Sequence, residues 1–344
     1  MTSIFRASTI LLVLLALAVS HGSGQRASQT PPASPADATA RIAAAATALV
    51  SALDEAGRGR VQFPFEGPQK TKWSNLPTGI FERQGLRMGD LTPAQRAAVM
   101  KLLQSALSPD GYRKVTEIIR ADEVLRGGGS GRGKLNFGED EYYLAFLGTP
   151  SAKTPWMLQF GGHHLAINLT LAGGRASMTP SLPATQPAKY TFEGREIRPL
   201  GKENDKAFEL INALDEAQRG QAILKFSVSD LVLGPGQDGR VIQPEGIRAS
   251  VLSAAQQTLL LEIVREWAGI MNESFAEPRM AEIRANLPQT YFAWSGPTTN
   301  GSVAYFRIQG PTLVIEYAPQ KSVDHIHTIY RDPTNDYGAK FAAK

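Results

Sequence analysis

The histidines of this chain lie in pairs, and these pairs are the clearest sign of chemistry in the sequence. Four of the five form two groups, the adjacent His163 and His164 and the alternating His325 and His327. The fifth, His21, lies near the start of the chain. Neutral imidazoles bind zinc and copper, and three of them leave one coordination position for water or a substrate. We therefore predict a shared transition-metal site, zinc or copper, built from the two pairs.

The spacing inside each pair limits which rings can reach one ion. On a β-strand, His325 and His327 point to the same face, so both rings can contact a single metal. The adjacent His163 and His164 point to opposite faces of a regular strand, unless the two glycines before them bend the backbone. The expected site therefore holds three imidazoles, two from the second pair and one from the first.

Charged residues beside the second pair are candidates for supporting roles. Asp324 and Asp332 can orient the imidazoles, and Arg331 can hold an anionic substrate. The segment D-P-T-N-D at 332–336 is equally typical of a turn, in which Asp and Asn bond to the local backbone. Glu316 is a further candidate ligand or base, although a glutamate that faces solvent is the simpler interpretation.

Several functions are compatible with these residues. A metal-dependent hydrolase or oxidoreductase acting on a small molecule is the first hypothesis. A non-catalytic protein that binds or delivers a metal is the second, and a metal-free enzyme that uses His and Asp as acid and base is the third. Buried histidines that only hydrogen-bond to carboxylates are the structural alternative.

Composition excludes other classes of protein. The chain has no cysteine, which rules out disulfides, thiol catalysis and iron–sulfur ligation. The 36 basic and 32 acidic residues give a net charge of +4 that is spread along the chain, so we expect no nucleic-acid partner. The sequence lacks the G-x-S-x-G, Walker A and H-E-x-x-H motifs.

The elements that must position these residues repeat within the chain. The segment A-L-D-E-A-G-R-G at 52–59 recurs as A-L-D-E-A-Q-R-G at 213–220. Three further blocks recur in the same order, at 91–95 and 252–256, 143–148 and 291–296, and 160–167 and 308–315. A shared order of matched blocks indicates an internal duplication. We therefore divide the body into two related halves, 38–200 and 201–344.

Each half is expected to follow one α+β plan, with helices first and an antiparallel meander after them. Thr92 with Gln95, and Ser253 with Gln256, are typical of capping boxes at helix starts. Helices are predicted at 38–55, 93–106 and 112–125, and at 207–217, 254–271 and 278–286. Meander strands are predicted at 142–147, 156–160 and 165–169, and at 290–294, 304–308 and 313–317.

The two histidine pairs occupy places that do not correspond in the repeat. His163 and His164 match Pro311 and Thr312, and the counterpart of the second pair, near 175–179, has no histidine. Because each half contributes one pair, we expect the site to lie between the halves, where binding sites are common.

The N-terminus is typical of an export signal. Arg6 precedes an uncharged, apolar run at 7–19, and small residues follow it. This run is too short to span a membrane, so we expect a cleaved signal at 1–24 and no stable membrane insertion afterwards. The Ser-, Pro- and Ala-rich stretch 25–37 is expected to be a flexible leader. The mature protein is then periplasmic or extracellular.

Three motifs resemble one family of exported proteins. They are F-G-G-H-H-L-A-I-N at 160–168, T-Y-F-A-W-S-G at 290–296 and H-I-H-T-I-Y-R-D-P-T-N-D-Y-G at 325–338. The chain resembles the DUF3500 family over roughly residues 38–340. The two histidine motifs are fairly specific to that family, but its function is unknown, so the resemblance implies no reaction.

Overall fold

The computed structural model describes residues 33–128 and 135–341. The predicted signal at 1–24, His21 and most of the predicted leader lie outside the described residues. The end of the leader is different from the prediction, because residues 35–37 already belong to the first helix, whose start is capped by the side chain of Ser34. Of the helices in the described part of the chain, none combines the length and apolarity needed to cross a membrane.

The chain has the mixed α+β class that the sequence predicts, and its helices form two sets. The first set is α1 (Pro35–Ser51), α2 (Glu55–Val61), α3 (Pro93–Ala106) and α4 (Pro109–Gly127). The second is α5 (Gly201–Ala213), α6 (Glu216–Ala222), α7 (Ala254–Ala268) and α8 (Glu273–Ala285). The predicted capping boxes are present at the starts of α3 and α7, where each cap satisfies backbone N–H groups that the helix leaves free.

The strands form two main antiparallel sheets. The first contains β1 (Gln62–Phe63), β2 (Leu86–Arg87), β3 (Tyr143–Leu147), β4 (Trp156–Gly162), β5 (Leu165–Ala172), β6 (Arg175–Ser177) and β7 (Leu182–Pro183). The second has the order β10 (Ile247–Arg248), β11 (Tyr291–Ser295), β12 (Tyr305–Gly310), β13 (Leu313–Pro319) and β14 (Ile326–Arg331). A small hairpin of β8 (Tyr190–Phe192) and β9 (Arg195–Ile197) is separate from both. β1 is the exception to the antiparallel pairing, since it runs parallel to β3.

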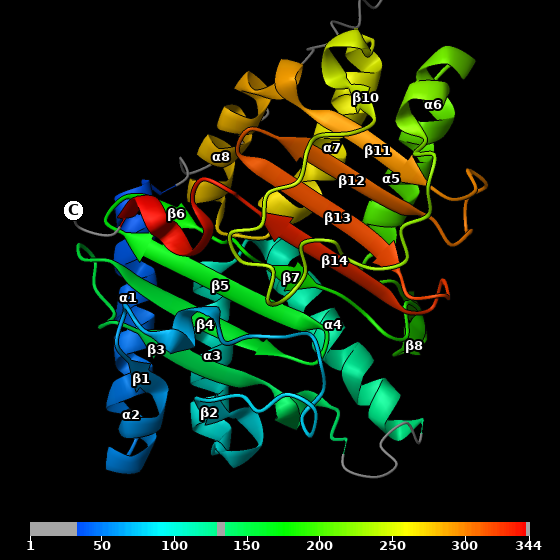
Figure 1. The fold of residues 1–344 in the computed structure, drawn as a ribbon. Helices are drawn as coiled ribbons and strands as arrows, with labels where there is room; N and C mark the ends of the chain where they lie inside the picture. The colour runs from blue at the N-terminus through cyan, green and yellow to red at the C-terminus, as the bar shows by residue number, and fades with distance from the viewer. Residues whose placement is uncertain (1–32, 129–134, 342–344) are drawn as a thin grey trace, which may run out of the picture. The chain divides into compact units, whose positions relative to one another are not determined.

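A short segment around β7 joins the two sheets. On one side β7 pairs with β5, through Leu165 with Pro183 and Ala166 with Leu182. On the other side, single bridges connect Ser181 to Tyr330 and Thr185 to Ile326 of β14. Figure 1 shows β5, β7 and β14 in this order, so the two sheets meet along β7.

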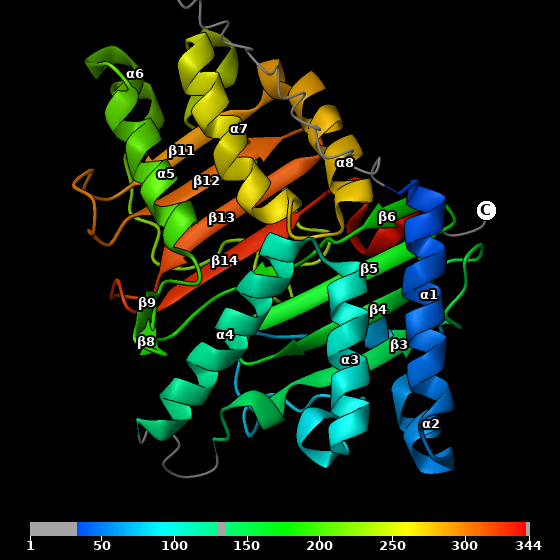
Figure 2. The same cartoon turned by 180° about the vertical axis from the view of Figure 1, so that it is seen from behind.

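Helices and irregular segments cover opposite faces of the sheets. The helices lie on one face, with α1, α3 and α4 over the first sheet and α5, α7 and α8 over the second (Figure 2). Each sheet has its own core on this side, built around residues such as Ile42 and Leu102 in the first and Phe208 and Trp267 in the second. The segments 62–85 and 223–246 cover the other face, where a third apolar cluster includes Trp73 and Tyr337.

The two halves contain the same order of elements. In each, a short strand, a 3₁₀ turn and two long helices precede the meander: β2, α3, α4 and β3–β5 in the first half, and β10, α7, α8 and β11–β13 in the second. A glycine with positive φ precedes β2 and β10 alike, at Gly85 and Gly246, and a Cβ there would lie 2.3 and 2.1 Å from a carbonyl oxygen of β3 and β11. The origin of the halves by duplication stays a prediction.

Candidate metal centre

The first histidine pair occupies a turn and not a strand. Gly162 pairs with Leu165, so His163 and His164 are the two residues that link β4 to β5. His164 has a φ of 62°, in the left-handed region that non-glycine residues seldom adopt. This conformation brings the two rings against each other, with centroids 3.6 Å apart and planes tilted by 31°, instead of placing them on opposite faces of a strand.

The second pair lies at the start of β14, which brings it beside this turn. His327 is the second residue of β14, and His325 directly precedes the strand. The segment that joins the sheets fixes both sides: Ala184 N–H donates to the His164 carbonyl at 2.8 Å, and the Ile326 N–H donates to the Thr185 carbonyl at 3.0 Å. The two pairs therefore meet where the sheets join.

Three imidazoles converge in this place. Nε2 of His325 lies 2.9 Å from Nε2 of His164 and 3.0 Å from Nε2 of His327. A tetrahedral zinc site with bonds of about 2.0–2.1 Å separates its nitrogens by about 3.3 Å, so small movements would fit an ion between the three rings. His164 and His327 are buried, and His325 is partly exposed.

Burial lowers the pKa values of two of these rings, those of His164 and His325. Desolvation lowers the pKa of His164 well below its usual value, and charges on His163, His327 and His325 would lower it further. Desolvation, with the charges of His327 and His163, lowers the pKa of His325 to about 4. Neutral imidazole is the form that binds a metal, so these surroundings favour the ligand form of both residues.

Two irregular segments supply polar groups around the three nitrogens. Asn75 lies in the segment 62–85. Its backbone carbonyl accepts the His164 N–H at 3.2 Å, and its side-chain Nδ2 lies 3.2 Å from Nε2 of His327. Asp230, in the segment 223–246, contacts Nδ1 of His327 through Oδ1 at 3.3 Å. A carboxylate on the second ring nitrogen is the usual support of a metal-binding histidine.

His163 belongs to a second group. Its Nδ1 lies 2.6 Å from Oδ1 of Asp122 on α4, and both side chains are buried. The Tyr142 hydroxyl donates to the His163 carbonyl at 2.9 Å, which holds the turn against the first core. Asp122, His163 and His164 also place their possible ligand atoms within 4.8 Å of one another. His163 thus contacts the converging group by stacking on His164, while its own nitrogen is bound to a carboxylate.

Comparison with known proteins gives one match. The family model DUF3500, described as a protein of unknown function, matches residues 35–339. The chain belongs to the DUF3500 family. Neither the curated proteins nor the solved structures yield a match.

In this DUF3500 protein, the aspartates predicted beside the second pair bond to partners other than the imidazoles. Asp324 is exposed, and its side chain accepts the Ala188 N–H at 3.1 Å. Asp332 pairs with Arg279 at 3.1 Å and accepts the Thr334 N–H within its turn. The carboxylates that contact histidines are those of Asp122 and Asp230 instead.

Arg331 and Glu316 are both buried in the second sheet and have structural partners. Arg331 bonds to Asp238 and Asp336 at 3.0 and 2.8 Å and to the carbonyls of Leu233 and Gly234. Its guanidinium therefore has little capacity left for a substrate. The interpretation of Glu316 as facing solvent is wrong, because Glu316 accepts the N–H groups of Val232 and Leu233 and the Tyr305 hydroxyl.

The supporting residues of the DUF3500 site carried no signal in the sequence. Asn75 and Asp230 lie in segments with no periodic pattern, and Asp122 lies on the buried side of a helix among ordinary charged residues. Their roles follow from long-range contacts across 252, 97 and 41 residues of chain.

Proposed function

We propose that this DUF3500 protein binds one transition-metal ion, zinc or copper, through His164, His325 and His327. The convergence of three Nε2 atoms carries the proposal. A proton on His325 Nε2 can satisfy one neighbouring lone pair well, whereas a metal cation accepts the lone pairs of all three nitrogens at once. The donor set suits zinc and copper, which prefer imidazole over oxygen ligands.

We further propose that the site is catalytic and acts on a small molecule. A metal held by three imidazoles supplies a Lewis acid that lowers the pKa of water and polarises a carbonyl or phosphoryl oxygen. The partial exposure of His325 supports an open coordination position on its side. In this proposal Asp230 holds His327 in its ligand orientation, and Asn75 fixes the backbone of His164.

The Asp122–His163 contact favours a second candidate, metal-free acid–base catalysis. A buried carboxylate on one ring nitrogen leaves the other nitrogen able to exchange a proton with a substrate. These two candidates differ in whether the protein contains a metal. The third candidate, a non-catalytic metal carrier, also contains one, and it differs from the metal enzyme in whether the bound metal keeps an exchangeable water.

Metal content of the mature protein tests the proposal. The protein would be purified from its own host without a histidine tag and analysed by elemental mass spectrometry. We expect near-stoichiometric zinc or copper in the parent and its loss in a His325→Ala, His327→Ala double variant. His163→Asn is the matched control, since His163 is bound to Asp122 and should leave the metal in place. Absence of metal in the parent, even after reconstitution with zinc or copper, would move the assignment to acid–base chemistry.

Export is part of the same proposal. We propose that the N-terminal signal at 1–24 directs the protein to the periplasm or the medium, where free transition metal and small substrates are accessible. N-terminal sequencing of the protein recovered outside the cytoplasm tests this: we expect a start between residues 21 and 25. A start at Met1 in the recovered protein would overturn it.

A further inference from the structure

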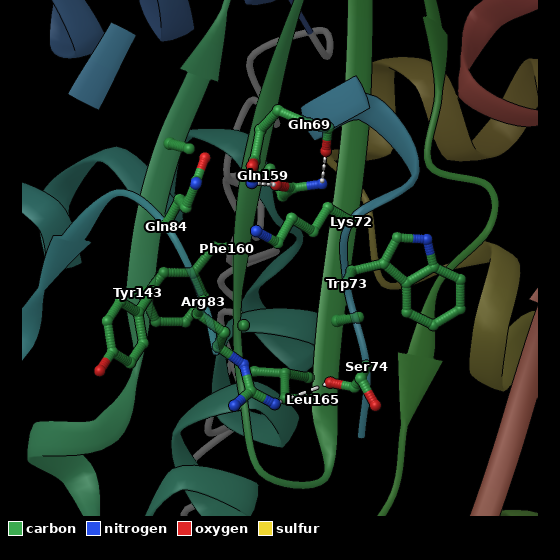
Figure 3. Close-up of a pocket in the computed structure, with 13 residues that line it drawn as sticks. Gln69, Lys72, Trp73, Ser74, Arg83, Gln84, Tyr143, Gln159, Phe160 and Leu165 are labelled. Atoms are coloured by element: carbon green, nitrogen blue, oxygen red, sulfur yellow. Dashed lines mark hydrogen bonds between the residues drawn. The ribbon is translucent and has the colours of Figure 1, made fainter. Parts of the chain in front are cut away.

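A pocket lies on the first sheet beside the proposed metal centre. It lies between strands β3–β5 and the segment 62–85. Figure 3 shows its lining, which combines polar side chains such as Gln69, Lys72, Arg83 and Gln84 with apolar ones such as Phe160 and Leu165.

The pocket contains two cations without a carboxylate partner. Among the described residues, neither Lys72 nor Arg83 forms an ion pair, whereas the neighbouring Lys70 pairs with Glu66. Lys72 is exposed, and its amine extends across the middle of the pocket in Figure 3. Two positive groups that line one pocket and form no ion pair there favour an anionic ligand.

Arg83 is the more unusual of the two. Its Nη2 donates to the carbonyls of Ser74, Leu76 and Gly162, while Nη1 is buried with no hydrogen-bond partner. Burial lowers the pKa of Arg83, although more distant Tyr142, Tyr143, Asp122 and Glu141 counteract this. A buried guanidinium nitrogen without an acceptor is costly.

The same end of the pocket is connected to the three histidines. Arg83 bonds to Gly162 at 2.8 Å, directly before the His163–His164 turn. Ser74, which also lines the pocket, precedes Asn75, the residue that contacts both His164 and His327. A ligand anchored at Lys72 and Arg83 therefore lies next to the segments that hold the metal ligands.

We infer that this pocket binds the anionic group, a carboxylate or a phosphate, of the molecule on which the metal centre acts. The inference rests on the proposed function for the reaction, but the anion site stands on its own contacts. It assigns to Lys72 and Arg83 the substrate-holding role that the sequence suggested for Arg331. The Gln84 amide also lines the pocket and can contact the uncharged part of the ligand, whereas the Gln159 amide is bonded to Gln69 and Asn168.

Calorimetric titration with acetate and with inorganic phosphate tests the inference. Both anions would be titrated into metal-free protein, and acetate also into zinc-loaded protein. We expect the metal-free protein to bind at least one of them, and the preferred anion to identify the group. Lys72→Gln should raise the dissociation constant about tenfold, because a charged hydrogen bond is lost. Lys101→Gln, at an exposed lysine on α3, should leave it unchanged.

A second variant keeps the test independent of one side chain. Gln84→Glu places a carboxylate among the two cations and should abolish binding while the unfolding temperature stays near that of the parent. Equal affinity in Lys72→Gln and Lys101→Gln, or no binding of either anion to the parent, would overturn the inference.

The outcomes also separate this inference from the proposed function. One outcome would place the anion on the metal and refute the pocket. In that outcome only zinc-loaded protein binds acetate, the His325→Ala, His327→Ala variant loses this binding, and Lys72→Gln retains it. If the protein binds an anion but takes up no zinc or copper even after reconstitution, the pocket stands and the metal site is refuted.

Discussion

His164 and His325 are separated by 161 residues, yet their Nε2 atoms lie 2.9 Å apart. The segment around β7 accounts for this closeness, because its backbone bonds to the His164 turn on one side and to the start of β14 on the other. The site is thus fixed by main-chain hydrogen bonds between two sheets. Such a frame holds the three proposed ligands in place in advance, which would lower the ordering cost of metal binding.

The left-handed turn at His164 predicts an unusual order of stability among variants. His164→Gly and His164→Ala both remove a proposed metal ligand, but only glycine adopts a φ of 62° without strain. In the metal-free state we expect His164→Gly to be more stable than His164→Ala by about 1 kcal/mol. Denaturant unfolding of the two proteins measures the difference.

The corresponding turn of the second half is the control. Thr312 occupies the same place between β12 and β13 but is not among the described non-glycine residues with positive φ. There the order should reverse, with Thr312→Ala more stable than Thr312→Gly. If the alanine variant is more stable than the glycine variant at both turns, the conformation of His164 is not strained.

Local patterns predicted the elements of this fold well. The span 93–106 and both capping boxes are as expected, because caps and apolar spacing act within one helix. The opening helix differs: α1 ends at Ser51 and α2 begins at Glu55, since Asp54 caps a new helix. Apolar periodicity continues through the break, so the pattern alone gave one helix.

The histidine pairs could be found from the sequence, but their support could not. Type and spacing identified His325 and His327 because both depend on one strand. The choice between His163 and His164 depends on a two-residue turn, which the expected strand pattern did not include. Asp230 reaches His327 from an irregular segment, and no local rule predicts such a contact.

Asp230 is expected to support metal binding, whereas Asp324 is not. Asp230→Asn weakens the acceptor on Nδ1 of His327 and should raise the zinc dissociation constant about tenfold, the lower range for such supporting carboxylates. Asp324→Asn alters only a contact with Ala188 and should leave the zinc affinity unchanged. Competition with a chelating dye measures both constants. A larger effect at Asp324 would return the supporting role to that residue.

The metal-free protein should lose stability in acid partly through His325. Burial, with the charge of His327, lowers the folded-state pKa to about 4, whereas an unfolded histidine has a pKa of about 6.5. Between these values the unfolded chain binds a proton that the folded protein does not. This contribution to stability is therefore full above about pH 6.5 and is lost as the pH falls towards 4.

Replacement of this histidine isolates its contribution to the pH dependence. His325→Gln should show a smaller fall in unfolding temperature than the parent between pH 7 and pH 4.5, with both proteins freed of metal. The carboxylates that titrate over the same range are common to the two proteins, so the difference reports His325. Parallel curves would contradict the lowered pKa.

Arg331 is expected to matter for folding and not for the metal or the substrate. The residue is 3% exposed and bonds to two carboxylates and two carbonyls, so Arg331→Gln leaves Asp238 and Asp336 without their shared cation. Breaking one partner of such a buried pair costs about 3 kcal/mol. Chemical denaturation should show this loss, while the folded fraction of the variant keeps its zinc. Arg195→Gln, at an exposed arginine, should change neither quantity. A variant that folds normally but no longer binds acetate would instead show that Arg331 holds the substrate.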